Sequence, residues 1–158
     1  MVAVSSTQSN KARMRLAEFR DVDKLSELYR LARKGDEDAR LIHDWLEQGG
    51  AMLLEDAQGS ILSVLRWQED GEGWQLERIA TLPEHRGKGF GRWLLTTVEA
   101  LAIKRNIASL ALCIPQHRRQ ELASYYGRMG YRDIVSENAE QLCLQKRVGG
   151  IWQSQTAS

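Results

Sequence analysis

The sequence is poor in cysteine, in proline and in long apolar runs. Its two cysteines, Cys113 and Cys143, are too few for a disulfide framework, and both lie in apolar stretches where cysteine usually acts as a small buried hydrophobe. We therefore expect reduced thiols and a cytoplasmic protein. Two prolines and 13 glycines exclude collagen-like and Pro/Gly-rich chains. The sequence has no basic-then-apolar leader and no apolar run of about 18 residues, so we expect neither a signal peptide nor a membrane span.

Neither positive nor negative charge predominates in the sequence. Twenty-two Lys and Arg against 21 Asp and Glu give a net charge of +1, so no overall field draws the chain to nucleic acid or to acidic membranes. The hydrophobic share of 42% in 158 residues is enough for the core of one compact domain. We expect a disordered N-terminal tail over residues 1–11, one domain over 12–148 and a C-terminal tail over 149–158, in which the role of Trp152 is open.

The periodicity of apolar residues predicts an alternation of strands and helices. A first strand is expected at Ala12–Phe19, and two amphipathic helices follow it before residue 49. Three short apolar or alternating runs then indicate antiparallel strands, and a helix, a strand, a helix and two strands complete the chain. The predicted order is β-α-α-β-β-β-α-β-α-β-β.

The most informative stretch is IATLPEHRGKGFGRWLL, in which a strand leads into a glycine-rich loop that opens into a helix. Glycines allow backbone N–H groups to approach a ligand, and a helix N-terminus favours phosphate. Arg86, Lys88 and Arg92 add positive charge, so the stretch predicts a diphosphate site. A Walker A loop is excluded because Gly89 follows Lys88, and the dinucleotide fingerprint is excluded by its glycine spacing and by the antiparallel strands before it. A glycine-rich turn that only caps the helix is the structural alternative.

Two motifs resemble the GCN5-related N-acetyltransferases, the GNAT superfamily. Arg86-x-x-Gly89-x-Gly91 matches the family's acetyl-CoA signature, and Tyr126-x-x-x-Gly130-Tyr131 resembles the end of its fourth helix. The resemblance extends in element order over nearly the whole chain. It implies one α/β domain, with a mixed, mostly antiparallel sheet flanked by helices.

The resemblance also implies a use of acetyl-CoA as cosubstrate and assigns residues to it. In the family the pantetheine arm binds along the fourth strand between two diverging strands, and the diphosphate rests on the loop that follows. A strand N–H near Ile79 or Leu82 would meet the developing oxyanion. The cofactor-binding residues implied are Ile79, Ala80, Thr81, Arg86, Gly87, Lys88, Gly89, Phe90, Gly91 and Arg92.

Glu77 is the candidate general base. Strand alternation places it on the same face as Ile79 and Thr81. An amine nucleophile is protonated at neutral pH and must lose a proton, which a carboxylate accepts directly or through water. The alternative is a structural charge that pairs with a neighbour such as Arg78.

Tyr126 is the candidate general acid, because a phenol can donate a proton to the departing thiolate. Helical spacing places it on the face of Leu122 and Met129, so a core aromatic is the alternative. Many family members have an asparagine about seven residues before this tyrosine, where this sequence has Arg119. We therefore expect weaker cofactor contacts from this helix and an intact main loop.

The function implied is acetyl transfer to a primary amine, by direct attack in a ternary complex without an acyl-enzyme. The amine belongs to a small molecule or a peptide that the sequence does not identify. The alternative is a non-catalytic acyl-CoA-binding or regulatory domain, and a nucleic-acid module is disfavoured by the neutral charge balance. We expect no metal, because the three histidines lack metal-ligand spacing. We expect neither a membrane nor a nucleic-acid partner, and a homodimer is left open.

Overall fold

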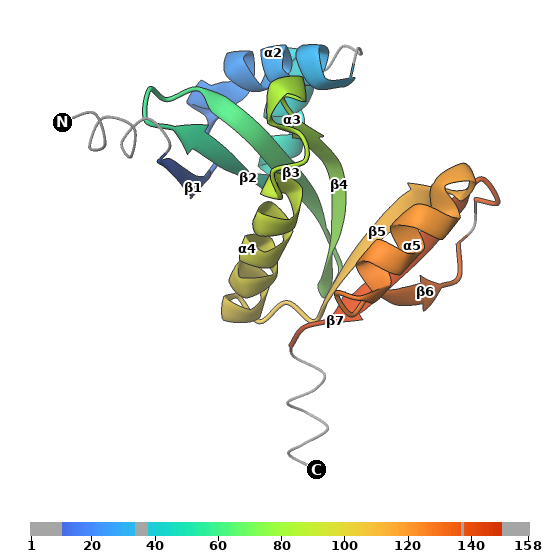
Figure 1. Ribbon diagram of the computed structural model, residues 1–158. Coiled ribbons are helices and arrows are strands. Elements are labelled where there is room, and N and C mark those ends of the chain that lie inside the picture. The colour runs from blue at the N-terminus through green and yellow to red at the C-terminus, as the bar shows by residue number, and fades with distance from the viewer. Residues whose placement is uncertain (1–10, 34–37, 137, 150–158) are drawn as a thin grey trace. The chain divides into compact units, whose positions relative to one another are not determined.

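The computed structural model describes residues 11–33, 38–136 and 138–149 (Figure 1). Its helices and strands follow the predicted order. The strands are β1 (Ala12–Leu16), β2 (Gly49–Asp56), β3 (Ile61–Asp70), β4 (Gly73–Thr81), β5 (Ser109–Pro115), β6 (Arg132–Ile134) and β7 (Gln141–Arg147). The α-helices are α2 (Val22–Arg33), α3 (Ala39–Gln48), α4 (Phe90–Lys104) and α5 (Arg119–Gly127), and the 3-10 turns are Phe19–Asp21, Pro83–His85 and Gln116–Arg118. Nearly all of the predicted N-terminal tail, the end of the predicted C-terminal tail and Trp152 lie outside the described residues.

The chain divides into two compact units, which we describe separately. The first comprises residues 1–68 and 78–98, and the second comprises 69–77 and 99–158. In the first unit β1, β2, β3 and the end of β4 are neighbours in that order, with β1–β2 and β2–β3 antiparallel. Helices α2 and α3 pack together, and α3 packs on β2. Their apolar faces form a core with the strands that includes Leu25, Leu28, Tyr29, Ile42, Trp45, Ala51, Leu53, Ile61, Val64 and Ala80.

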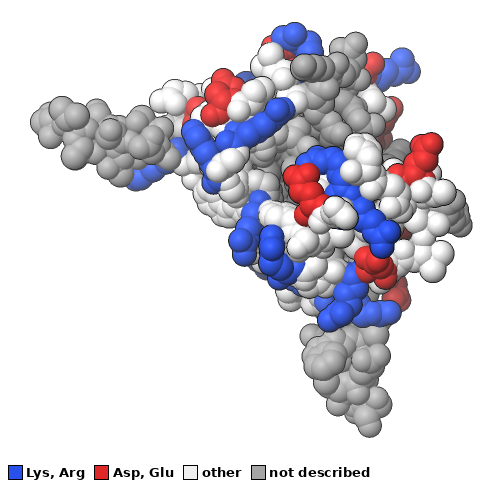
Figure 2. Space-filling view, turned by 45° about the vertical axis from the view of Figure 1, so that its right-hand side comes forward, with Lys and Arg blue, Asp and Glu red and all other residues white. Residues whose placement is uncertain are grey.

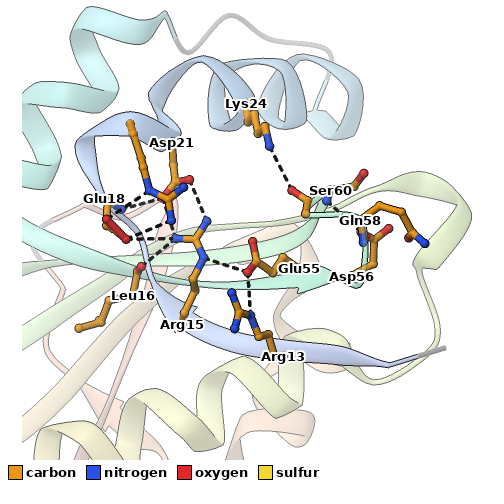
Figure 3. A network of polar contacts seen from close by, with 12 residues as sticks. Arg13, Arg15, Leu16, Glu18, Asp21, Lys24, Glu55, Asp56, Gln58 and Ser60 are labelled. Carbon is orange, nitrogen blue, oxygen red and sulfur yellow. Dashed lines mark hydrogen bonds and ion pairs between the residues drawn. The ribbon is translucent and has the colours of Figure 1, made fainter. Parts of the chain in front are cut away.

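A buried ionic network ties β1 to its surroundings in the first unit (Figure 3). The Arg15 guanidinium donates to both carboxylate oxygens of Asp21, at 2.8 and 2.9 Å, and lies 3.1 Å from Glu55 Oε1. Asp21 also accepts from the backbone N–H of Glu18 at 2.8 Å. This turn ends β1 at Leu16, so the predicted strand to Phe19 is three residues too long. The hydrogen bonds from Arg15 lower the pKa of Asp21 and of Glu55 below their usual values.

The second unit contains the beginning of β4, then β5, β7 and β6 in that order. Gly73 to Gln75 of β4 run parallel to Ser109 to Ala111 of β5, whereas β5–β7 and β7–β6 are antiparallel. Helix α5 packs on β5. Alternate β5 residues Leu110, Leu112 and Ile114 are buried, as a strand with one face in the core requires.

The prediction of reduced thiols is wrong in this structure. Cys113 of β5 lies opposite Cys143 of β7, with their Cα atoms 4.0 Å apart, and the two sulfur atoms form a disulfide. The pairing depends on the register of two strands that are 30 residues apart in sequence. A count of cysteines cannot show that register, and the apolar flanks of both residues are equally compatible with a buried disulfide.

Among the described residues, no helix has the length and apolar character needed to cross a membrane. On the face shown in Figure 2, Lys and Arg are interspersed with Asp and Glu. This distribution matches the balanced net charge of +1.

Candidate active site

The predicted diphosphate loop lies in the first unit, between the end of β4 and the start of α4. After the 3-10 turn at Pro83–His85, the backbone takes positive φ angles at Gly87 (+80°) and Gly89 (+81°). A Cβ at either position would meet no atom within 4 Å, so the backbone angle alone demands glycine there. Gly91 differs, because a Cβ there would lie 3.9 Å from Ile79 Cγ2. The first turn of α4 therefore lies beside Ile79 of β4.

The loop presents a row of unpartnered backbone donors. Gly89 accepts the first hydrogen bond of α4, from Trp93 N at 3.0 Å. Within the described residues, the N–H groups from Gly87 to Arg92 have no recorded acceptor outside the helix itself. The first N–H groups of a helix lack intrahelical partners, and the positive end of the helix dipole lies at the same place. This arrangement fits a phosphate or diphosphate.

The charged side chains of the loop are not equivalent. The Arg86 guanidinium donates to the carbonyl oxygen of Ala32, near the C-terminal end of α2, and so anchors the loop. Lys88 and Arg92 are exposed, and Lys88 Nζ lies 3.0 Å from His85 Nδ1. Arg86 therefore has a structural contact, whereas the exposed Lys88 and Arg92 side chains can reach a ligand.

The end of β4 carries a contact that the sequence did not predict. Ser63 of β3 is fully buried, and its hydroxyl donates to the carbonyl oxygen of Ala80 at 3.0 Å. Its oxygen lies 2.7 Å from Thr81 Oγ1, which must then be the donor of that second bond. These bonds hold the backbone of Ala80 and the Thr81 hydroxyl in place. Leu82 N donates to Leu62 O at 3.0 Å, so this N–H is engaged within the sheet and the prediction that it meets an oxyanion is not supported.

Burial along β4 follows the predicted alternation. Trp74, Leu76 and Ala80 are buried, whereas Glu77, Ile79 and Thr81 are half-buried. Glu77 is therefore accessible on the same side of the strand as the two residues expected to line the cofactor.

Tyr126 lies near the end of α5 in the second unit. Its ring packs edge to face against Tyr125 and Tyr131, with centroids 5.0 and 5.9 Å away. Burial, followed by the neighbouring Tyr125, raises the pKa of Tyr126 above its usual value. A raised pKa keeps the phenol protonated at neutral pH, as a proton donor requires.

The hydroxyl groups of Tyr131 and Tyr126 differ in their hydrogen bonds. Its hydroxyl donates to Glu99 Oε2 at 2.8 Å, and Lys146 Nζ lies 3.2 Å from the other oxygen of Glu99. The Tyr126 hydroxyl has no hydrogen-bond partner recorded in the described part of the chain. Of the two tyrosines, Tyr126 is the one available to donate.

Comparison with known proteins agrees with this geometry. Residues 17–131 match the model of the acetyltransferase (GNAT) family. A comparison with curated protein sequences finds no significant match. Among solved structures, the ribosomal-protein-S18-alanine N-acetyltransferase from Escherichia coli has a TM-score of 0.76 at 16% identity, over 88% of this chain and 95% of that chain. The PaiA N-acetyltransferase from Thermoplasma acidophilum, in complex with coenzyme A, has a TM-score of 0.74 at 15% identity, over 87% and 99%.

A third similar structure is the GNAT family N-acetyltransferase YhbS from Escherichia coli in complex with CoA, with a TM-score of 0.72 at 18% identity over 88% of this chain and 82% of that chain. At these identities the structures show the fold alone, whereas the family model covers most of the chain. The chain belongs to the acetyltransferase (GNAT) family. The predicted α/β fold and the predicted enzyme class, an N-acetyltransferase that uses acetyl-CoA, are confirmed at the level of the family.

Proposed function

We propose that this protein transfers the acetyl group of acetyl-CoA to a primary amine, by direct attack of the amine in a ternary complex. The observation that carries the proposal is the loop from Gly87 to Arg92. Its open N–H groups, its two positive φ angles and its place at the start of α4 fit the diphosphate of coenzyme A. Family membership supplies the acetyl-transfer chemistry.

The cofactor side of the site would combine backbone and side-chain contacts. The backbone of Ile79, Ala80 and Thr81 would bind the pantetheine arm, and the N–H groups of Gly87, Lys88, Gly89, Phe90 and Gly91 would bind the diphosphate, assisted by the Lys88 and Arg92 side chains. The N–H of Arg86 donates to Pro83 O at 3.3 Å, so Arg86 would contribute by anchoring the loop through its side chain. The hydroxyl contacts of Ser63 support this assignment, because they fix the backbone of Ala80 in advance of binding. Preorganised contacts lower the cost of binding.

Two side chains would carry out the proton transfers. Glu77 would accept one proton from the ammonium form of the amine, and the freed nitrogen then forms the new bond to the thioester carbonyl carbon. The carbon–sulfur bond breaks, its electron pair leaves with sulfur, and Tyr126 would supply a proton to the thiolate. The nitrogen's second proton leaves as the amide forms and, through water, restores the Tyr126 phenol. General acid or base catalysis of this kind contributes about 10²–10⁴-fold each. Holding amine and thioester together supplies a larger share of the rate.

The partner of acetyl-CoA would be an amine of a small molecule or a peptide, and no metal is needed for the proposed steps. We also propose a cytoplasmic location, since the acetyl-CoA that the reaction consumes is too polar to cross membranes unaided. Because Cys113 and Cys143 form a disulfide, reduced thiols are no longer an argument for this location.

The test is a steady-state assay of free CoA with a panel of primary amines at several acetyl-CoA concentrations. Amine-dependent CoA release with intersecting initial-velocity lines supports direct transfer. Parallel lines indicate an acyl-enzyme and contradict it. Binding of acetyl-CoA without release in the presence of any amine favours the alternative of a non-catalytic acyl-CoA-binding domain.

A further inference from the structure

Helix α5 carries the proposed general acid, Tyr126, but it has no buried residue. All nine of its residues, Arg119–Gly127, lie in the described part of the chain, and each is half-buried or exposed. Helices in proteins are held mostly by the side chains that they pack against the core. The position of Tyr126 must therefore depend also on the residues that follow the helix.

The residues after α5 form a helix cap that includes Tyr126. Tyr131 N donates to Tyr126 O at 3.1 Å, and Gly130 N donates to Gly127 O at 3.1 Å. With Gly130 at a φ of +98°, these two bonds make a Schellman motif, in which the residue after the glycine often packs against the residue whose carbonyl it caps. That contact joins the rings of Tyr131 and Tyr126, whose centroids are 5.9 Å apart. The spacing of Tyr126, Gly130 and Tyr131 is therefore that of a helix cap.

Tyr131 is itself anchored by residues outside α5. It is 3% exposed, and its hydroxyl donates to Glu99 Oε2 at 2.8 Å. Glu99 lies on α4, and its other oxygen accepts from Lys146 Nζ of β7 at 3.2 Å. All three residues belong to the second unit. The side chains of Glu99 and Lys146 are 12% and 29% exposed, so water competes little with these charge-assisted bonds. Glu99 therefore holds the residue that caps α5.

We propose that Glu99 is a positioning residue for Tyr126 and acts through Tyr131. With its hydroxyl held by Glu99, the Tyr131 ring gives the Tyr126 ring a fixed surface, which it meets edge to face at an interplanar angle of 70°. Proton transfer needs a donor within hydrogen-bond reach, and a displacement of roughly 1 Å can cost about 10²-fold in rate. The inference rests on the proposed function, in which Tyr126 donates to the thiolate. It goes further in assigning a role to a carboxylate on another helix.

The test is a double-mutant cycle in kcat, with acetyl-CoA and the amine of the panel that wild type turns over fastest. Tyr131→Phe removes the donor of the anchoring bond, and Glu99→Leu removes its acceptor. Each should lower kcat by about 10–100-fold, and no more than Tyr126→Phe does, with the Kd for acetyl-CoA unchanged. In a Tyr126→Phe background the same two changes should lower kcat no further, because the donor that they position is absent. A general loss of structure would lower kcat equally in both backgrounds.

Two further variants separate the hydrogen bond from charge and from the mere loss of a glutamate. Glu99→Gln keeps an oxygen that accepts from the Tyr131 hydroxyl, so it should retain most of the wild-type kcat. Glu121→Leu is the matched control for Glu99→Leu, since Glu121 is an exposed glutamate of α5 that lies 3.2 Å from Arg118. Its kcat should equal that of wild type. Tyr131→Phe keeps the ring and the ion pair of Glu99 with Lys146, so the cycle remains decisive even if Glu99→Leu does not fold.

Three results would overturn the inference and leave Tyr126 as the acid. They are a wild-type kcat in Tyr131→Phe, an equal further loss in the Tyr126→Phe background, and a Glu99→Gln variant as slow as Glu99→Leu. A wild-type kcat in Tyr126→Phe, or a wild-type protein that turns over no amine, would instead refute the proposed function, and the inference with it.

Discussion

The glycine at position 89 permits a sharp test of the diphosphate loop. Its φ of +81° lies in the left-handed region, and a Cβ there would meet no neighbouring atom. Gly89→Ala therefore adds backbone strain without a clash, at a cost of about 1–2 kcal/mol. Gly71, in the turn between β3 and β4, has a φ of +63° and equally open surroundings. Gly71→Ala is therefore a matched control away from the loop.

The strain at Gly89 is relieved if the exposed loop changes conformation, and ligand binding must then restore the original one. A cost of 1–2 kcal/mol corresponds to a rise of about 5–30-fold in the Kd for acetyl-CoA. In the control the Kd should equal that of wild type, and its melting temperature should fall by about 2–8 °C. Calorimetric titration and thermal melting measure these quantities. A wild-type Kd in Gly89→Ala, or an equal loss of affinity in both variants, would refute the reasoning.

Three further outcomes are expected. Tyr126→Phe should lower kcat by about 10²–10⁴-fold with little change in the Kd for acetyl-CoA. A kcat equal to that of wild type would reject Tyr126 as the general acid, and a loss of kcat in Tyr125→Phe alone would assign that role to Tyr125. Glu77→Gln should remove the low-pH limb of the kcat/KM profile, and a limb that persists returns Glu77 to a structural role. Asp21→Asn should destabilise the fold by about 1–3 kcal/mol in chemical denaturation, because it removes the carboxylate that accepts two hydrogen bonds from the largely buried Arg15 and leaves Glu55 as its close ionic partner. Wild-type stability should also fall as the pH drops below about 4, because the lowered pKa of Asp21 stabilises the fold only while the carboxylate is ionised; Glu27→Gln, in an exposed pair, should leave the melting temperature near that of wild type.

Local signals explain what the sequence predicts well. The helix start after Gly89 was predictable because glycines and a helical period meet there. Alternation in β4 likewise predicts which of its residues are half-buried. These features depend on neighbours within a few residues.

Contacts between distant segments explain what the sequence does not predict. The Cys113–Cys143 disulfide depends on strand register, and the Ser63 hydroxyl bond depends on how β3 pairs with β4. Glu99 carries no local motif that relates it to Tyr131 or Lys146, although it contacts both. Each of these needs the folded chain, because the sequence gives residue types and spacing but not which strands become neighbours.

The measurement that tests the central claim most directly is a titration with coenzyme A followed by the backbone amide chemical shifts. The account predicts that the largest changes fall on the N–H groups of Gly87, Lys88, Gly89, Phe90 and Gly91, as donors that gain a phosphate acceptor. It also predicts that these changes disappear in Gly89→Asp, which places a carboxylate at the phosphate site. Saturable binding that leaves these five amides unshifted, or that persists unchanged in Gly89→Asp, would contradict the claim that this loop binds the diphosphate.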